Sequence, residues 1–95
     1  MITFEWHAKK AAQNYRKHQV SFEEAKEVFD DPHGRLMHDP DHSTNEDRFV
    51  LLGMSFGLRL LVICHCYRQH DEIIRIISAR KATRHEQNKY EEEVT

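Results

Sequence analysis

The chain has 95 residues and a formal net charge of −2, with 32% charged and 39% hydrophobic residues. A chain of this length forms one small domain with a single modest core, so we expect one domain over residues 1–95. No apolar run reaches the roughly 18 residues of a membrane span, and the first ten residues lack the apolar segment of a secretion signal. These features exclude a membrane protein and predict a cytoplasmic one.

The small net charge hides a separation of charges along the chain. Residues 21–47 hold nine acids against two cations, whereas residues 48–90 hold eight cations against three acids. A basic surface can therefore exist on a nearly neutral molecule. Such a surface attracts phosphate groups and nucleic acid, and the attraction weakens as salt is added.

The first thirty residues predict one strand and two helices. Ile2, Phe4 and Trp6 share one parity, which is typical of a short strand with one buried face. A narrow apolar stripe then predicts a helix to about residue 18. The members of this stripe are Ala8, Ala11, Ala12 and Tyr15. Ser21 and Glu24 form a capping box, which starts a second helix that ends before Pro32.

The rest of the chain predicts a sheet followed by a last helix. Residues 35–38 form one candidate strand, ahead of a loop around Pro40. Apolar, β-branched segments at residues 48–54, 58–67 and 73–79 predict two successive hairpins. A second capping box, at Thr83 and Glu86, starts the C-terminal helix. The expected fold is α+β: a small antiparallel sheet with the two N-terminal helices packed on one face, and a C-terminal helix.

Two patterns resemble metal sites only superficially. Cys64 and Cys66 are the only cysteines, and their spacing in a strand places both on one face as small apolar residues. The run from His38 to His42 holds two imidazoles and two carboxylates, but a loop centred on Pro40 lacks the regular spacing of metal ligands. We expect neither a metal nor another cofactor.

Motifs along almost the whole chain resemble those of the BrnT toxins of bacterial type II toxin–antitoxin systems. The matching residues are FEW at 4–6, Asn14, KH at 17–18, VSF at 20–22, Glu46, Arg48, RIISARKAT at 75–83, Glu86 and Tyr90. The chain departs from the family at His7 and Gln19, where Asp and Gly are usual. Both departures lie at helix ends and weaken the capping there.

The resemblance implies a RelE-like fold and metal-independent RNA cleavage, which inhibits translation and arrests growth. It also implies neutralisation by a BrnA-type antitoxin, in a dimeric toxin–antitoxin complex that binds operator DNA only through the antitoxin. Two alternatives remain open from the residues alone. One is a non-catalytic module that binds RNA or protein with the same basic face, and the other is a metal-dependent hydrolase.

Arginines are the first candidates for a catalytic site, because the guanidinium fork matches phosphate oxygens. Arg80 would stabilise transition-state charge, or it would form an ion pair with Glu46 or Glu86. Arg75 is the second candidate, although the two arginines differ in parity and would point to opposite faces unless the strand ends or bulges before Arg80. Arg48 would hold a phosphate or form an ion pair, with Glu46 beside it in the site.

The remaining candidates are a histidine and a set of RNA contacts. His65 titrates near neutrality and would serve as general base or acid, with a structural role as the alternative. The predicted RNA contacts are Lys17, His18, Lys81, Arg84 and Tyr90. Simpler roles compete for these residues, such as helix capping for His18 and core packing for Tyr90.

Overall fold

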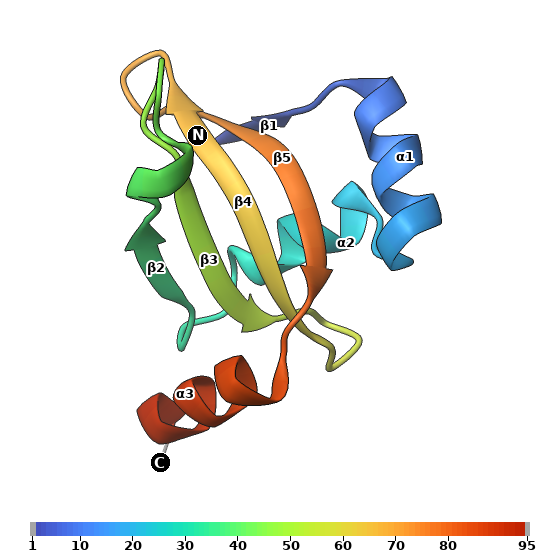
Figure 1. Cartoon of the computed structure of the whole chain (residues 1–95), viewed down its shortest axis with the longest axis vertical. Coiled ribbons are helices and arrows are strands. Elements are labelled where there is room, and N and C mark those ends of the chain that lie inside the picture. Colours follow the sequence, from blue (N-terminus) through green and yellow to red (C-terminus); the bar gives the residue numbers. More distant parts are fainter. Residues whose placement is uncertain (1, 95) are drawn as a thin grey trace.

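This computed structural model describes residues 2–94 of the chain. They contain three α-helices and five strands (Figure 1). The strands are β1 (Thr3–Glu5), β2 (Arg35–His38), β3 (Phe49–Met54), β4 (Leu60–Arg68) and β5 (Ile73–Lys81). The helices are α1 (Ala8–His18), α2 (Phe22–Val28) and α3 (Arg84–Val94), with one 3₁₀ turn at Pro40–His42. The predicted α+β class is confirmed. No helix within these residues is long and apolar enough to cross a membrane.

The sheet has the strand order β1-β5-β4-β3-β2. The two predicted hairpins are present, because β3, β4 and β5 pair antiparallel with their sequence neighbours, as does β2 with β3. However, β1 pairs in parallel with β5, so the sheet is mixed and the expectation of a purely antiparallel sheet is wrong. Alternation of side chains shows which residues share a face, but it carries no information on the partner or direction of a strand.

The two faces of the sheet are covered differently. Residues of α2 and the segment before it pack on one side, which we call the α2 face; its buried members are Leu51, Leu61, Ile63, Ile76 and Ala79. The other side, which we call the open face, carries Val50, Leu52, Val62, Cys64, Arg75 and Arg80 by alternation. Tyr90 of α3 packs on Leu52 and Val62 at one end of the open face. In Figure 1, α1 lies beside β5 and α3 lies beyond the lower end of the sheet.

The predicted apolar stripe of α1 is buried only in part: Ala11 packs against the core, whereas Ala8 and Ala12 are exposed. Tyr15 is 55% exposed, whereas Asn14 is only 8% exposed. The Asn14 amide nitrogen donates to the carbonyl oxygens of Val20 (3.1 Å) and Ala79 (2.8 Å), and its side-chain oxygen accepts from the Ala79 N–H (3.1 Å). One polar side chain thus joins α1 to the backbone of β5. Hydrophobic periodicity missed it because the buried residue is an amide.

The N-terminal end of α1 is weakly capped, as the departure at His7 predicts, whereas the Gln19 N–H donates to the Tyr15 carbonyl oxygen (2.8 Å) at the C-terminal end. His7 forms no side-chain hydrogen bond to the first turn. Gln19 ends the helix with a φ of 55°, in the left-handed region that favours glycine.

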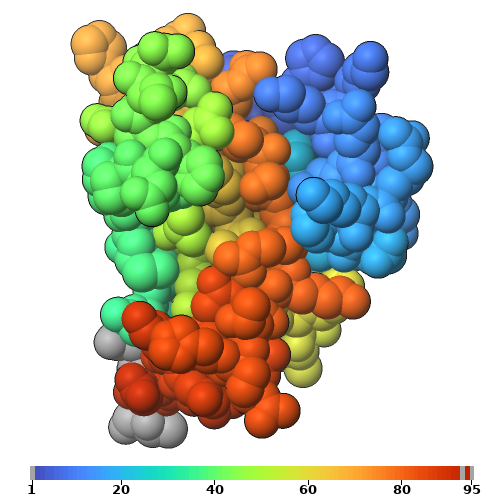
Figure 2. All heavy atoms as spheres, viewed as in Figure 1, coloured from blue at the N-terminus to red at the C-terminus, as the bar shows by residue number. Residues whose placement is uncertain are grey.

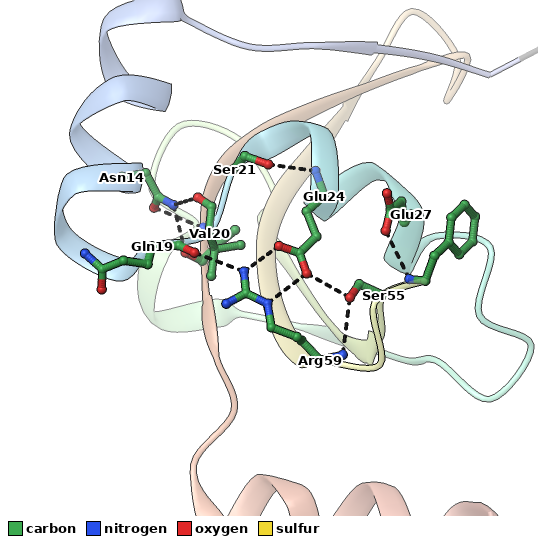
Figure 3. Close-up of polar contacts among 10 residues, drawn as sticks. Asn14, Gln19, Val20, Ser21, Glu24, Glu27, Ser55 and Arg59 are labelled. Atoms are coloured by element: carbon green, nitrogen blue, oxygen red, sulfur yellow. Dashed lines mark hydrogen bonds and ion pairs between the residues drawn. The ribbon is translucent and has the colours of Figure 1, made fainter.

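The Ser21 capping box is half formed, because the Ser21 hydroxyl accepts from the Glu24 N–H (3.0 Å) while the Glu24 carboxylate turns elsewhere. This carboxylate accepts from Arg59 Nε (2.9 Å), pairs with Arg59 Nη2 and accepts from the Ser55 hydroxyl (2.8 Å) (Figure 3). The hydrogen bond from Arg59 outweighs burial and lowers the pKa of Glu24. The network joins the β3–β4 turn to the start of α2.

Candidate active site

A bulge in β5 decides where its arginines point. The pairing of β4 with β5 passes from Cys64 opposite Ser78 to His65 opposite Ile76, so one extra residue, Ile77, interrupts the alternation. Ile76 and Ala79 consequently both lie on the α2 face. Arg75 precedes the bulge and Arg80 follows it, so both side chains lie on the open face. The two arginines thus share a face although their parity differs, because the strand bulges before Arg80.

The open face is hollowed between residues 39–48 and the first turns of α1 (Figure 2). One hollow of about 260 Å³ is lined by Arg48, Arg80, Ser78, Cys64, Asp39 and His42, among others. A smaller hollow of about 60 Å³ beside it includes Arg48, Arg75, Glu46, His7 and Lys10. We call the two hollows together the basic groove. Arg48 lines both of them.

Arg80 is held by a carboxylate from α3. Its guanidinium donates to both oxygens of Glu86, at 2.8 and 2.9 Å, and the carboxylate also accepts from the Thr83 N–H (2.8 Å). The Thr83 hydroxyl accepts from the Glu86 N–H (3.2 Å), which completes the second capping box. Of the two predicted ion-pair partners of Arg80, the structure shows Glu86. This two-point contact fixes the direction of the guanidinium.

Arg75 belongs to a chain of alternating charges across the sheet. Arg75 donates to Glu5 of β1 (2.7 Å), Glu5 lies 3.6 Å from Arg68, and Arg68 lies 3.5 Å from Glu46. Glu46 is therefore engaged by Arg68 rather than by Arg80 or Arg48. These partly exposed pairs contribute little stability individually, but they orient Arg75 along the wall of the basic groove.

Arg48 differs from its neighbours because it forms no ion pair with any carboxylate that the structure describes. Its side chain is half-buried and close enough to the Cys64 thiol to lower the pKa of that thiol, although burial has the larger effect and raises it. A guanidinium without a carboxylate partner is available for an incoming phosphate. Among the three predicted arginines, Arg48 is thus the best placed to bind substrate directly.

His65 does not join the arginines. Its side chain is completely buried on the α2 face, against the rings of Phe29, Phe49 and Tyr67. Its ring nitrogens contact the Ile63 carbonyl oxygen (3.1 Å) and the Tyr67 hydroxyl (3.2 Å), and burial lowers the pKa of the imidazole. The prediction of His65 as general base or acid is therefore wrong for a site on the open face.

Tyr90 is unsuitable for stacking on an RNA base. It is 7% exposed and its hydroxyl donates to Asp31 (2.6 Å). Burial and this hydrogen bond raise the pKa of the phenol to about 12. Tyr90 instead joins α3 to the turn after α2, which corrects its assignment as an RNA contact.

The other predicted RNA contacts lie outside the basic groove. Lys81 and Arg84 are exposed beyond Arg80, and by alternation Lys81 points to the α2 face. Lys17 and His18 lie at the C-terminal end of α1, whereas His7 and Lys10 at its N-terminal end line the smaller hollow. The sequence analysis missed His7 and Lys10 as groove residues. The RNA-contact role of Lys17, His18, Lys81 and Arg84 stays a prediction.

The sequence analysis also missed a histidine and carboxylate pair in the larger hollow. His42 Nδ1 lies 2.8 Å from Asp39 Oδ2. Both residues fall in the run that suggested a metal site, yet no three His, Cys, Asp or Glu side chains within the described chain are grouped so that they could hold a metal ion. The run from His38 to His42 was visible in the sequence, but the sequence does not show which strands flank this loop, and they decide which side chains of the run come together.

The Arg80–Glu86 pair predicts an acid-dependent loss of stability. The Arg80 guanidinium lowers the pKa of Glu86 to about 2 from 4.5, so the folded state gains stability from this carboxylate above pH 4.5 and loses it as the pH falls towards 2. We expect Glu86→Gln to lower the free energy of unfolding by about 1 to 2 kcal/mol near neutral pH. The difference from wild type should vanish near the lowered pKa, as measured by urea unfolding across this range. A difference that is independent of pH would contradict the assignment.

The comparisons with known proteins identify a family and a similar fold. A family model described as the ribonuclease toxin, BrnT, of type II toxin–antitoxin systems matches residues 6–86. The crystal structure of the Brucella abortus ribonuclease toxin, BrnT, is similar with a TM-score of 0.64 and 21% identity, over 88% of this chain and 100% of that chain. At this identity the structural match shows the fold alone. No curated protein matches the chain.

The family match spans residues 6–86, a range that contains Arg48, Arg75, Arg80 and Glu86. It also covers most of the chain rather than a single motif. The chain therefore belongs to the BrnT family of ribonuclease toxins of type II toxin–antitoxin systems.

Proposed function

We propose that this protein is a metal-independent, RelE-like endoribonuclease toxin that cleaves RNA in the basic groove. The observation that carries the proposal is Arg48, a guanidinium without a carboxylate partner in the described chain, located between Arg75 and Arg80 on one face of the sheet. The family assignment supports an RNA target and an antitoxin partner.

The proposed reaction uses the 2′-hydroxyl of RNA as the nucleophile. This oxygen attacks the adjacent phosphorus and displaces the 5′-oxygen, so the product is a 2′,3′-cyclic phosphate. Negative charge increases on the phosphoryl oxygens in the transition state, where fixed cations contribute most. Arg48 would contact these oxygens, while Arg80 and Arg75 would supply positive charge from positions fixed by Glu86 and Glu5. Glu46 would not contact the phosphate itself, since it forms an ion pair with Arg68.

Neutralisation would depend on a BrnA-type antitoxin, in a dimeric complex that binds operator DNA through the antitoxin. Cleavage of messenger RNA in the cytoplasm would inhibit translation and stop growth. An antitoxin segment that covered the basic groove would block RNA access directly.

The test is cleavage of RNA by the purified protein in EDTA, both as naked RNA and in a translation extract, with the product ends identified. We expect cleavage that leaves 2′,3′-cyclic phosphate and 5′-hydroxyl ends. Activity that disappears with EDTA and returns with a divalent cation would indicate a metal-dependent hydrolase. RNA binding without cleavage in either assay would indicate a non-catalytic module.

A further inference from the structure

The larger hollow contains, besides the arginines, a histidine paired with a carboxylate, to which the proposed reaction assigns no role. His42 Nδ1 and Asp39 Oδ2 are 2.8 Å apart. An ionised carboxylate can only accept a hydrogen bond, so the proton of this contact lies on Nδ1, and in the neutral imidazole the opposite nitrogen, Nε2, carries a free lone pair. A neutral imidazole held in this tautomer is prepared to accept a proton.

The loop that carries this pair is bound to the strand end that carries Arg48. The Asp39 N–H donates to the Arg48 carbonyl oxygen (2.8 Å), the Arg48 N–H donates to the Ser43 hydroxyl (2.9 Å), and that hydroxyl donates to the Asp39 carbonyl oxygen (2.6 Å). The 3₁₀ turn Pro40–His42 then brings His42 back over Asp39. These contacts hold the loop that carries the pair against the backbone of Arg48.

The two side chains of the pair differ in solvent exposure. The Asp39 side chain is 18% exposed and the His42 side chain is 67% exposed, so the carboxylate is enclosed while the imidazole remains accessible to a ligand. The other charged and titratable groups that line the same hollow are Arg48, directly before β3, Cys64 of β4 and Arg80 of β5. A phosphodiester bound by Arg48 would thus lie beside the imidazole.

We propose that His42 is the general base of the cleavage reaction and that Asp39 positions it, an inference that rests on the proposed ribonuclease function. His42 Nε2 takes the proton of the 2′-hydroxyl, the 2′-oxygen forms a bond to phosphorus, and the bond from phosphorus to the 5′-oxygen breaks. Water protonates the departing 5′-oxygen, and the hydroxide formed takes the proton from His42. The products are a 2′,3′-cyclic phosphate end and a 5′-hydroxyl end.

The same loop offers a matched control. His38 Nε2 lies 3.3 Å from Asp47 Oδ1 and 3.5 Å from the Ser43 hydroxyl, a contact that glutamine can replace, and the His38 ring contacts the Phe49 ring at 5.4 Å between centroids. Alternation along β2 and β3 places this contact on the α2 face. His38 is therefore a second imidazole paired with a carboxylate, but on the other side of the sheet from the basic groove.

The experiment measures cleavage of a defined RNA by wild type, His42→Gln, Asp39→Asn and His38→Gln. We expect His42→Gln to be about 10²- to 10⁴-fold slower, with unchanged binding of a non-cleavable 2′-O-methyl RNA, and His38→Gln to retain wild-type cleavage. Imidazole added to His42→Ala should restore part of the rate. The pH dependence of the wild-type rate should be absent in His42→Gln and altered in Asp39→Asn.

The possible failures are distinguishable. Wild-type cleavage that His42→Gln retains would overturn the role of His42 while leaving the ribonuclease proposal intact. Equal loss of RNA binding and cleavage in His42→Gln would also overturn it, in favour of a binding role. Absence of cleavage by wild type, on naked RNA and in a translation extract, would overturn the proposed function and this inference with it.

Discussion

Arg48→Gln should lower the rate of RNA cleavage by about 10²- to 10³-fold, the loss typical of removing one donor from a charge-stabilising site. The physical reason is the lack of a carboxylate partner for Arg48 within the described chain, in contrast to Arg75 and Arg80. Removing it takes away an available phosphate contact and breaks no ion pair, so the free energy of unfolding should change by less than about 0.5 kcal/mol. Single-turnover cleavage and urea unfolding measure the two effects.

Two variants serve as controls for this result. Arg48→Lys keeps the charge but loses the planar fork, so its rate should lie between those of wild type and Arg48→Gln. Arg16→Gln removes an exposed cation from α1 outside the basic groove and should cleave like wild type. If Arg16→Gln and Arg48→Gln lost activity equally, general attraction to RNA would explain the effect and Arg48 would have no special role.

Asn14→Ala should lower the free energy of unfolding by about 3 kcal/mol, a large part of the stability of a domain of this size. The change removes three hydrogen bonds and leaves the Ala79 N–H and the Val20 and Ala79 carbonyl groups without the partner that Asn14 provides. Each buried backbone group without a partner costs about 1 to 3 kcal/mol. The total loss should lie at the lower end of this range for three groups, because water can reach some of them in the variant. Urea unfolding of the purified variant measures the difference.

Gln13→Ala is the matched control, because Gln13 is the exposed neighbour of Asn14 on the same helix. Its free energy of unfolding should remain within about 0.5 kcal/mol of wild type. Asn14→Asp keeps the acceptor for the Ala79 N–H but loses both donated hydrogen bonds, so it should also be strongly destabilised. A stable Asn14→Ala would mean that α1 is attached mainly by its apolar contacts.

Local patterns predicted most of the elements because each depends on neighbouring residues. The Thr83 and Glu86 capping box marked the start of α3, and alternation placed β3, β4 and β5 within about two residues of their observed ends. The parallel pairing of β1 with β5 was not predictable in this way, since its register joins Phe4 to Ile74 across most of the chain. Contacts between distant segments leave no periodic signal.

The candidate site was predictable only in part, for related reasons. Arg75 and Arg80 were identified, but a bulge at Ile77 decides that they share a face, and no glycine marks it in the sequence. The sequence suggested His65 as a general base or acid, yet it did not show that α2 covers that side of the sheet. The contact of His42 with Asp39 depends on how residues 39–48 fold back on β3, which composition does not reveal.

The central claim is that RNA binds in the basic groove, and backbone amide chemical shifts during titration with a 2′-O-methyl RNA oligonucleotide test it most directly. The account predicts shifts at Arg48, Ser78 and Arg80 and along residues 39–43 of the loop, which weaken as salt is raised. Shifts confined to the α2 face, around Phe49 and Tyr67, with the groove residues unchanged, would contradict it.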